Sequence, residues 1–391
     1  MAQNQGSPPW SNLPSELLGM VFLRLPARAD RAFFSAVCRQ WNSAAQDCLL
    51  PLPSPMPWVV LPTGSVVSFP HGETFHLPEG TRYHNSCGEW IMLSREDGSC
   101  FLMNPFTKAT MPLPSLSSYN HYEEPVKVDD DCIIPDHETR GPWMYNMDSE
   151  EISVLTLTVC STRLIAAIVS VGQLVSAYEE CRWLTHMVWF HGKLCAIDVD
   201  TEDLLAFHIV DEHDSDEPRI SRVERIIEGD PPLPEHYVTQ MQYLLESHGT
   251  LLMIRRNLSY SFLVAGTSDF EVFEADFDSY LWAEVKSLGN DHTLFVGRGC
   301  SRAVCVSPYD LSHDSIFFID DYTDWLWKKT TTTYGVYDMK DGKVYSPSPM
   351  VSWKSGNVPA TWLFSQVSTL VLKTQTCNGA LLEKLMTFDN D

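Results

Sequence analysis

Basic residues are scarce in this sequence of 391 residues, which has 27 Lys and Arg against 51 Asp and Glu and a formal net charge of −24. Residues 1–50 carry four Arg and three acidic residues, a balance of +1, so the rest of the chain carries about −25. An acidic surface repels phosphate groups. The charge therefore argues against nucleic acids and anionic membranes as partners.

Features of secreted or membrane-spanning proteins are also missing. The first residues, MAQNQGSPPW, show neither the basic region nor the apolar core of a signal peptide. The 11 Cys include no C-x-x-C pair, so we expect reduced thiols and a location in the cytoplasm or nucleus. The longest apolar stretch, residues 152–175, has Arg163 at its middle. A central arginine costs about 2.5–3.5 kcal/mol in a bilayer, so two buried strands joined near Ser161 are expected instead.

Sequence motifs of common catalytic and metal sites are absent too. There is no G-x-S-x-G, no G-x-x-x-x-G-K-[ST], no H-E-x-x-H and no G-x-G-x-x-G in a strand–helix setting. Cys300 and Cys305 have no nearby His to complete a zinc site. Asp320 and Asp321 are neighbours at a predicted strand end and would point to opposite faces. We therefore expect no catalytic group, no cofactor and no metal.

What the sequence does contain is a short helical segment near its start. Pro14 suits the first position of a helix, and apolar residues follow it at helical spacing until Pro26. Asp30 is expected to cap a second helix with Phe33 and Phe34, and Cys38 to begin a third. About 40 residues are too few to bury so many large apolar side chains among themselves. A partner or the rest of the chain must cover some of them.

The order LPxELL, an apolar run, RLP, Asp30 and VCRQW resembles the F-box. The resemblance implies that residues 10–47 form three helices that dock on the Skp-type adaptor of a Cullin–RING ubiquitin ligase. An ordinary helical hairpin packed on its own domain is the alternative. The residues implied in docking or in supporting it are Leu13, Pro14, Leu17, Leu18, Val21, Leu25, Pro26, Phe34, Val37, Cys38 and Trp41. Arg28 stands where an apolar residue is common, and Phe33 where a polar one is common.

After the Pro-rich residues 48–57, which are expected to form a stiff linker, the texture changes. Short apolar runs rich in Val, Ile, Phe, Tyr and Trp alternate with Gly, Asp, Asn and Pro, as in strands and turns. Hairpins are expected at 90–93 with 100–103, 194–197 with 204–207, 251–254 with 262–264, 316–319 with 325–327, and 336–339 with 344–345. Recurring units of this kind favour a β-propeller of about six to seven blades over residues 58–375. A large β-sandwich is the alternative.

Further passages resemble the C-terminal domain of a plant F-box family that is expanded in cereals and described as kelch-like or propeller-like. They are NPFTKATMPLP (104–114), YLLESHGTLLMIRR (243–256), FEVFEADFDSYLWAEVKSLGNDHTLFVG (270–297), SIFFIDD (315–321) and YGVYDMKDGKVYSP (334–347). The expected architecture is therefore a disordered N-terminus (1–9), a small all-α F-box, an all-β propeller, and a C-terminal tail (376–391).

The resemblance implies a non-catalytic substrate-recognition subunit of a Skp–Cullin–F-box E3 ubiquitin ligase. Its partners would be the Skp-type adaptor, through it a cullin, and a target protein bound by the β domain. Two alternatives stay open. One is an F-box interaction scaffold outside the ligase, and the other is a propeller enzyme, which would need titratable residues with shifted pKa values around a central channel.

Overall fold

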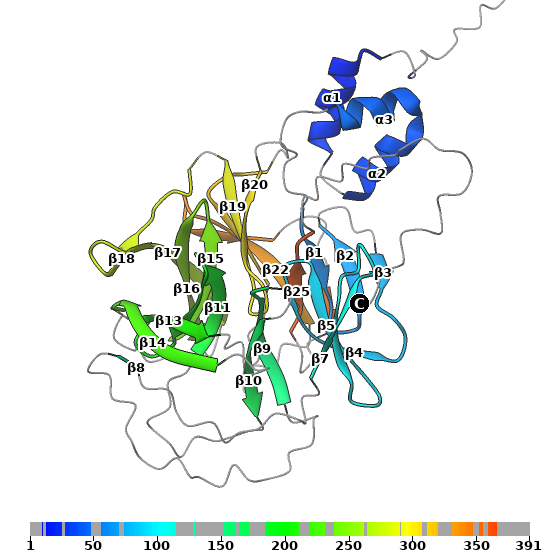
Figure 1. Ribbon diagram of the computed structural model, residues 1–391. Coiled ribbons are helices and arrows are strands. Elements are labelled where there is room, and N and C mark those ends of the chain that lie inside the picture. The colour runs from blue at the N-terminus through cyan, green and yellow to red at the C-terminus, as the bar shows by residue number, and fades with distance from the viewer. Residues whose placement is uncertain are drawn as a thin grey trace, which may run out of the picture.

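The computed structural model places three short helices before a domain made of strands (Figure 1). The residues it describes are 10, 13–25, 28–47, 56–69, 74–114, 128–129, 152–161, 164–171, 184–210, 219–230, 238–261, 264–289, 291–306, 311–319, 331–346, 352–354 and 359–365. Every structural statement below concerns these residues. The expected termini at 1–9 and 376–391 lie outside them.

The three helices are α1 (Ser15–Arg24), α2 (Arg28–Val37) and α3 (Arg39–Gln46). Pro14 sits at the N-cap of α1, one position earlier than expected, and its carbonyl oxygen accepts the N–H of Leu18 at 3.1 Å. Asp30 was expected to cap the second helix, and this prediction is wrong because α2 already begins at Arg28. Asp30 therefore lies inside the first turn, where its negative charge suits the helix dipole.

A small core holds the helices together. Leu18, Phe22, Phe34 and Ala44 are buried in it. The ring of Phe34 lies 5.1 Å from the ring of Phe22 and 4.5 Å from that of Trp41, centroid to centroid. One aromatic ring of α2 thus contacts both other helices, which fixes their packing.

The β domain consists of six sheets, which we number in chain order. Sheet 1 runs β25 (Thr361–Leu363), β1 (Trp58–Val60), β2 (Ser65–Ser68), β3 (Thr74–His76), and sheet 2 runs β4 (Thr81–Cys87), β5 (Trp90–Arg95), β6 (Cys100–Met103), β7 (Thr110–Leu113). Sheet 3 pairs β9 (Ile152–Val159) with β10 (Ile165–Val171). Sheet 4 runs β11 (Leu184–Phe190), β12 (Lys193–Asp198), β13 (Leu204–Val210), β14 (Arg219–Ile227), β8 (Val128–Asp129).

The last two sheets come from the C-terminal half of the domain. Sheet 5 runs β15 (Val238–Ser247), β16 (Thr250–Ser261), β17 (Val264–Asp276), β18 (Leu281–Glu284). Sheet 6 runs β20 (Arg302–Cys305), β19 (His292–Val296), β21 (Ser315–Ile319), β22 (Thr331–Asp338), β23 (Lys343–Tyr345), and β24 (Ser352–Lys354) also pairs with β22.

The six sheets form a closed ring, because each one shares a buried apolar cluster with the next. The ring is locked where the chain's last described strand, β25, pairs with its first, β1, so that Trp58 lies opposite Leu363. Radial closure of this kind leaves only short sheet edges exposed. The fold is a β-propeller, as expected, and not a sandwich. Five of the six sheets have at least four strands among the described residues.

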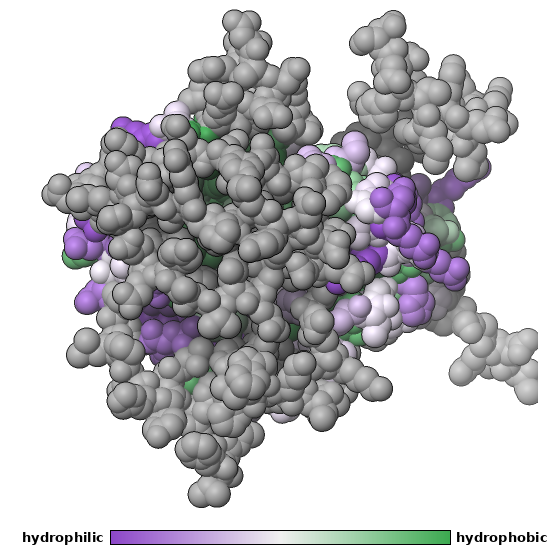
Figure 2. Space-filling view, turned by 90° about the horizontal axis from the view of Figure 1, so that it is seen from below, coloured by the Kyte–Doolittle hydropathy of each residue, from purple (hydrophilic) through white to green (hydrophobic). Residues whose placement is uncertain are grey.

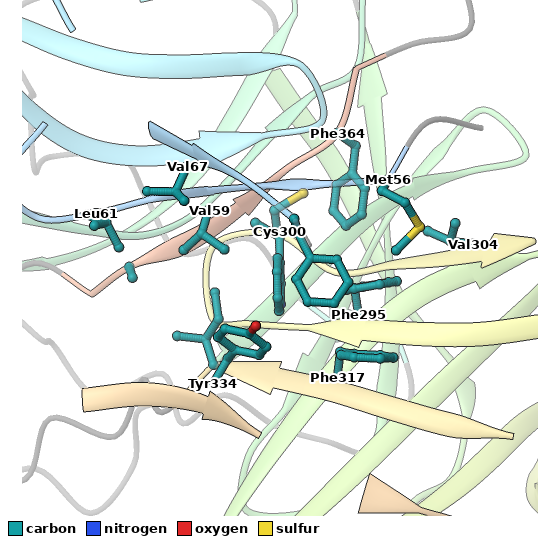
Figure 3. Close-up of a cluster of buried hydrophobic side chains, with 14 of the residues drawn as sticks. Met56, Val59, Leu61, Val67, Phe295, Cys300, Val304, Phe317, Tyr334 and Phe364 are labelled. Carbon is teal, nitrogen blue, oxygen red and sulfur yellow. The ribbon is translucent and has the colours of Figure 1, made fainter. Parts of the chain in front are cut away.

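Sheets 1 and 6 meet in an aromatic cluster that closes the ring (Figure 3). Phe295 and Phe317 stack with centroids 4.8 Å apart, and Phe69 meets Phe317 edge-on at 5.2 Å. Trp362 is fully buried, and its indole N–H donates to the carbonyl oxygen of Val296 at 2.9 Å. Residues from both ends of the domain therefore depend on each other for burial.

Most of the expected hairpins are confirmed. Strands β5 and β6, β12 and β13, and β22 and β23 pair as antiparallel neighbours. The apolar stretch 152–175 contains the hairpin β9–β10. No helix of the described residues has the length and apolar character needed to cross a membrane. The strand expected at 316–319 is β21, but its antiparallel partner is β22, and residues 325–327 lie outside the described part of the chain.

The hairpin expected at 251–254 with 262–264 is wrong, because β16 continues to Ser261 as one strand of 12 residues. A buried ion pair lets the charged Arg255 stand within this strand. The Arg255 guanidinium binds both carboxylate oxygens of Glu202, with Nε at 2.8 Å from Oε1, and the side-chain amide of Gln242 donates to Oε1 at 3.1 Å. Glu202 belongs to the turn between β12 and β13, so the pair joins sheet 4 to sheet 5.

Candidate functional site

The first helix presents large apolar side chains to solvent. Leu17, Met20 and Val21 are 46%, 50% and 44% exposed. Their spacing of three and four residues places them on one face of α1. Leu18 and Phe22 lie on the other face and fill the helical core. The amphipathic pattern of α1 therefore has a second apolar strip that the rest of the described chain leaves uncovered.

The second helix repeats this arrangement. Phe33 is 68% exposed and Val37 is 56% exposed, one helical turn apart on α2. Scattered exposed apolar residues are ordinary on a protein surface, whereas several large ones on two neighbouring short helices mark an interaction site. We call Leu17, Met20, Val21, Phe33 and Val37 the apolar helix faces.

The residues expected to dock or to support docking divide between surface and core. Pro14, Leu17, Val21 and Val37 are exposed, Leu18 and Phe34 are buried, Leu13, Leu25, Cys38 and Trp41 are partly buried, and Pro26 lies outside the described residues. Sequence reasoning missed Met20 and treated Phe33 only as a departure from the pattern. The spacing of Met20 from Leu17 was the available signal, since residues three apart share a helix face.

Hydrogen bonds hold the segment before α1 against α3. The Gln40 side-chain amide donates to the carbonyl oxygen of Leu13 at 2.8 Å, and the Trp41 indole N–H donates to that of Trp10 at 3.2 Å. In addition, Arg31 Nε donates to the Leu25 carbonyl oxygen at 2.9 Å and ties the end of α1 to α2. The apolar helix faces are therefore presented by a fixed scaffold, which lowers the ordering cost of binding.

The centre of the ring of sheets is a second candidate site. Residues 297–301, which we call the axis segment, join β19 to β20 and contact sheets 1, 2, 3 and 4. The Gly297 carbonyl oxygen accepts from His186 Nε2 at 3.3 Å, and the Arg298 carbonyl oxygen accepts from Thr156 Oγ1 at 3.1 Å. The Cys300 sulfur accepts the N–H of Gly88 at 3.3 Å. Glycine is needed at 299, because a Cβ there would lie 1.9 Å from Asn85 Oδ1.

Around the axis segment the buried polar groups mostly bond to one another. Asn85 Nδ2 donates to the carbonyl oxygens of Val154 and Leu155, both at 3.0 Å, and Ser86 Oγ lies 2.6 Å from Thr361 Oγ1. These bonds link sheets 1, 2 and 3 at their inner strands. They use several of the hydrogen-bonding groups at the centre to hold the sheets together.

Burial keeps three titratable groups at the centre neutral. It lowers the pKa of His186 to about 4, raises the pKa of Cys300 to about 12, and raises that of the Tyr83 hydroxyl. Desolvation is the largest cause in each case. Within the described ranges no group of three or more His, Cys, Asp or Glu is placed to hold a metal ion. His186, Cys300 and the Tyr83 hydroxyl are thus packed at the centre as uncharged groups, close to Arg298 of the axis segment.

Comparisons with known families agree with this division of the chain. A model described as the KIB1-4 beta-propeller matches residues 66–338, and a model described as F-box-like matches residues 10–50. The first match covers well over half of the chain and falls on the ring of sheets. The second covers all three helices.

Two F-box proteins are similar to this chain in sequence. A putative F-box protein of Arabidopsis thaliana is 21% identical over 381 residues, which is 84% of this chain and 88% of the relative. An F-box/kelch-repeat protein of the same plant is 29% identical over 161 residues, which is 36% of this chain and 46% of the relative. Among solved structures, apo AztD from Citrobacter koseri aligns with 79% of this chain and 97% of its own at 12% identity. The TM-score of this alignment is 0.26.

Proposed function

The chain belongs to the KIB1-4 beta-propeller family and carries an F-box-like module, and we propose that it is the substrate-recognition subunit of a Skp–Cullin–F-box E3 ubiquitin ligase. The observation that carries the proposal is the pair of apolar helix faces, whose five large side chains are 44–68% exposed. A Skp-type adaptor would cover them and bring a cullin with it. The β-propeller would bind the target protein, in the cytoplasm or nucleus.

In this proposal the chain acts by position and contributes no catalytic group. The adaptor and cullin hold the charged conjugating enzyme, while the propeller holds the target nearby. Target lysines are then kept at a high effective concentration relative to the ubiquitin thioester, which accelerates transfer without any chemistry on this chain. The buried and mutually bonded polar groups at the ring centre support a structural role for that region.

The experiment is co-elution of the purified full chain with a Skp-type adaptor and a cullin on a size-exclusion column. The wild-type chain should form a ternary complex. Leu17→Asp should abolish it, because this places a charge in the buried centre of an apolar interface, and it should leave folding intact because Leu17 is exposed. Gln46→Asp is the matched control, since Gln46 is an exposed polar residue of α3 and its change should leave the complex unaltered.

Two results would contradict the proposal. If the complex survives Leu17→Asp, the apolar helix faces are not the docking surface. If the adaptor binds but the cullin does not join it, the chain is an interaction scaffold outside the ligase. Circular dichroism of both variants establishes that their helices are intact.

A further inference from the structure

The turn between β17 and β18, together with the first residue of β18, exposes three large apolar side chains within five residues. Phe277, Tyr280 and Leu281 are 40%, 64% and 51% exposed, and in the described part of the β domain the only other large apolar residues that exposed are Ile220, Val344 and Tyr345. Figure 1 places this hairpin tip at the outer edge of the ring, beside β18. Figure 2, which views the molecule from below, shows hydrophilic side chains with a few hydrophobic ones along its left edge. Exposed apolar clusters with a polar rim mark interaction sites.

This turn is held in one conformation by its own contacts. The Asp276 carboxylate accepts the N–H groups of Asp278 at 3.0 Å and Ser279 at 3.2 Å. The N–H of Glu228 donates to the carbonyl oxygen of Tyr280 at 3.0 Å, which ties the turn to the end of β14. The ring of Phe277 stacks on that of Phe190 of β11, with centroids 6.0 Å apart. Exposed aromatic side chains on a fixed backbone lose little entropy when they bind.

The same two segments are acidic. Residues 228–230 and 276–281 contain Glu228, Asp230, Asp276 and Asp278 and no Lys, Arg or His. Glu228, Asp230 and Asp278 are exposed. Hydrogen bonds from Ser279 hold the pKa of Asp276 below its usual value, so this carboxylate stays charged. We call Glu228, Asp278, Phe277, Tyr280 and Leu281 the acidic–aromatic patch.

We propose that the acidic–aromatic patch docks a segment of the target protein in which Arg or Lys alternates with apolar residues. Charge complementarity selects this occupant. The apolar residues cover Leu281 and Phe277, while a guanidinium or ammonium group lies over the ring of Tyr280 and pairs with Glu228 and Asp278. The inference rests on the proposed function in that it names where and how the β domain takes its target. The proposal also gives a binding role to the acidic residues and exposed aromatic rings of this surface.

The test uses the full chain and three fluorescein-labelled synthetic peptides of 12 residues. The first alternates Leu and Arg, the second replaces every Arg by Glu, and the third replaces every Leu by Ser. Fluorescence polarisation should show binding of the first peptide with a Kd below about 1 mM and markedly weaker binding of the other two. The double variant Tyr280→Ala, Asp278→Asn should bind the first peptide about tenfold more weakly.

A matched control separates this patch from general attraction to an acidic protein. Tyr345 is 48% exposed on β23, and its hydroxyl donates to the Asp341 carboxylate, so Tyr345→Ala, Asp341→Asn removes the same two side-chain types elsewhere on the ring. This control variant should bind the first peptide as the wild type does. Equal loss in both variants, no loss in the patch variant, or equal binding of all three peptides would each overturn the proposal.

The remaining occupants and the proposed function are tested by the same proteins. If a second copy of this chain covers the patch, light scattering will show a dimer that the patch variant abolishes, and the proposal is wrong. The patch variant should still co-elute with the Skp-type adaptor, because the apolar helix faces are unchanged. Failure of adaptor binding in the wild type would therefore count against the ligase role, whereas failure of the peptide test would count against the patch alone.

Discussion

The buried pair of Glu202 and Arg255 gives the sharpest prediction about what holds the ring together. The Glu202 side chain is 0% exposed and that of Arg255 is 7% exposed. Glu202→Gln keeps the size of the side chain but removes its charge, so the guanidinium loses its bidentate partner inside the protein. Removing one partner of a buried ion pair costs about 3–5 kcal/mol. Glu271 still contacts Arg255 after this change, so the lower end of the range is expected. We expect a loss of unfolding free energy of that order.

Glu271 provides the matched control, because it binds the same guanidinium from a more exposed position. Its Oε2 lies 3.1 Å from Arg255 Nη1, and its side chain is 39% exposed. Glu271→Gln should therefore cost only about 0–1 kcal/mol, as exposed ion pairs do. The double change Glu202→Leu, Arg255→Met should recover most of the loss, since an apolar pair of similar volume replaces a buried ion pair at little cost.

Urea unfolding followed by tryptophan fluorescence measures these differences. With a slope of about 3 kcal/mol per M, the Glu202→Gln midpoint should fall by about 1 M, and that of Glu271→Gln should move by no more than a few tenths of that. Equal midpoints for Glu202→Gln and the wild type would show that the ion pair of Glu202 and Arg255 does not stabilise the contact between sheets 4 and 5.

Three further outcomes are expected. Stability should fall as the pH drops from 6.5 to about 4, because burial lowers the folded-state pKa of His84 and His186 to about 4. The unfolded chain takes up these protons at a higher pH than the folded chain, which costs up to about 3 kcal/mol of unfolding free energy per histidine. Urea midpoints at pH 7 and pH 4.5 check this. Gly299→Ala should lower the unfolding free energy by about 1–3 kcal/mol or more, because the added Cβ overlaps Asn85. Gly19→Ala should stabilise α1 by up to about 1 kcal/mol, because its added Cβ has no atom within 4 Å. Thermal unfolding measures both changes. In calorimetry Leu18→Ala should destabilise the helices by about 2–5 kcal/mol and Leu17→Ala by no more than about 0.5 kcal/mol.

Local pattern was enough to predict the three helices and many of the strands. Leu17, Leu18 and Val21 recur at helical spacing and lie on α1, and the turn between β22 and β23 falls where the sequence KDG indicated it. The same pattern could not say which apolar residue faces inward. Leu18 and Phe34 were grouped with Leu17 as docking or supporting residues, yet they form the helical core, because periodicity identifies faces and not what covers them.

The features that escaped prediction all depend on contacts between distant parts of the chain. Arg255 sits mid-strand because Glu202, 53 positions away, neutralises it, whereas charge in a sequence usually indicates exposure. Pairing of β25 with β1 and the path of the axis segment past Asn85 are likewise set by ring closure. No local signal encodes them. The acidic–aromatic patch was missed because Phe277 and Tyr280 stand in a passage that otherwise indicates buried strands and turns.

The most direct test of the central claim is hydroxyl-radical footprinting of the full chain with and without a Skp-type adaptor. Met20 is 50% exposed and Phe33 is 68% exposed on the apolar helix faces, and oxidation of both side chains should fall severalfold when the adaptor is added. Tyr345 is exposed on the β domain, outside the apolar helix faces, and should be oxidised at an unchanged rate. Unchanged oxidation of Met20 and Phe33 in the presence of bound adaptor would contradict the account.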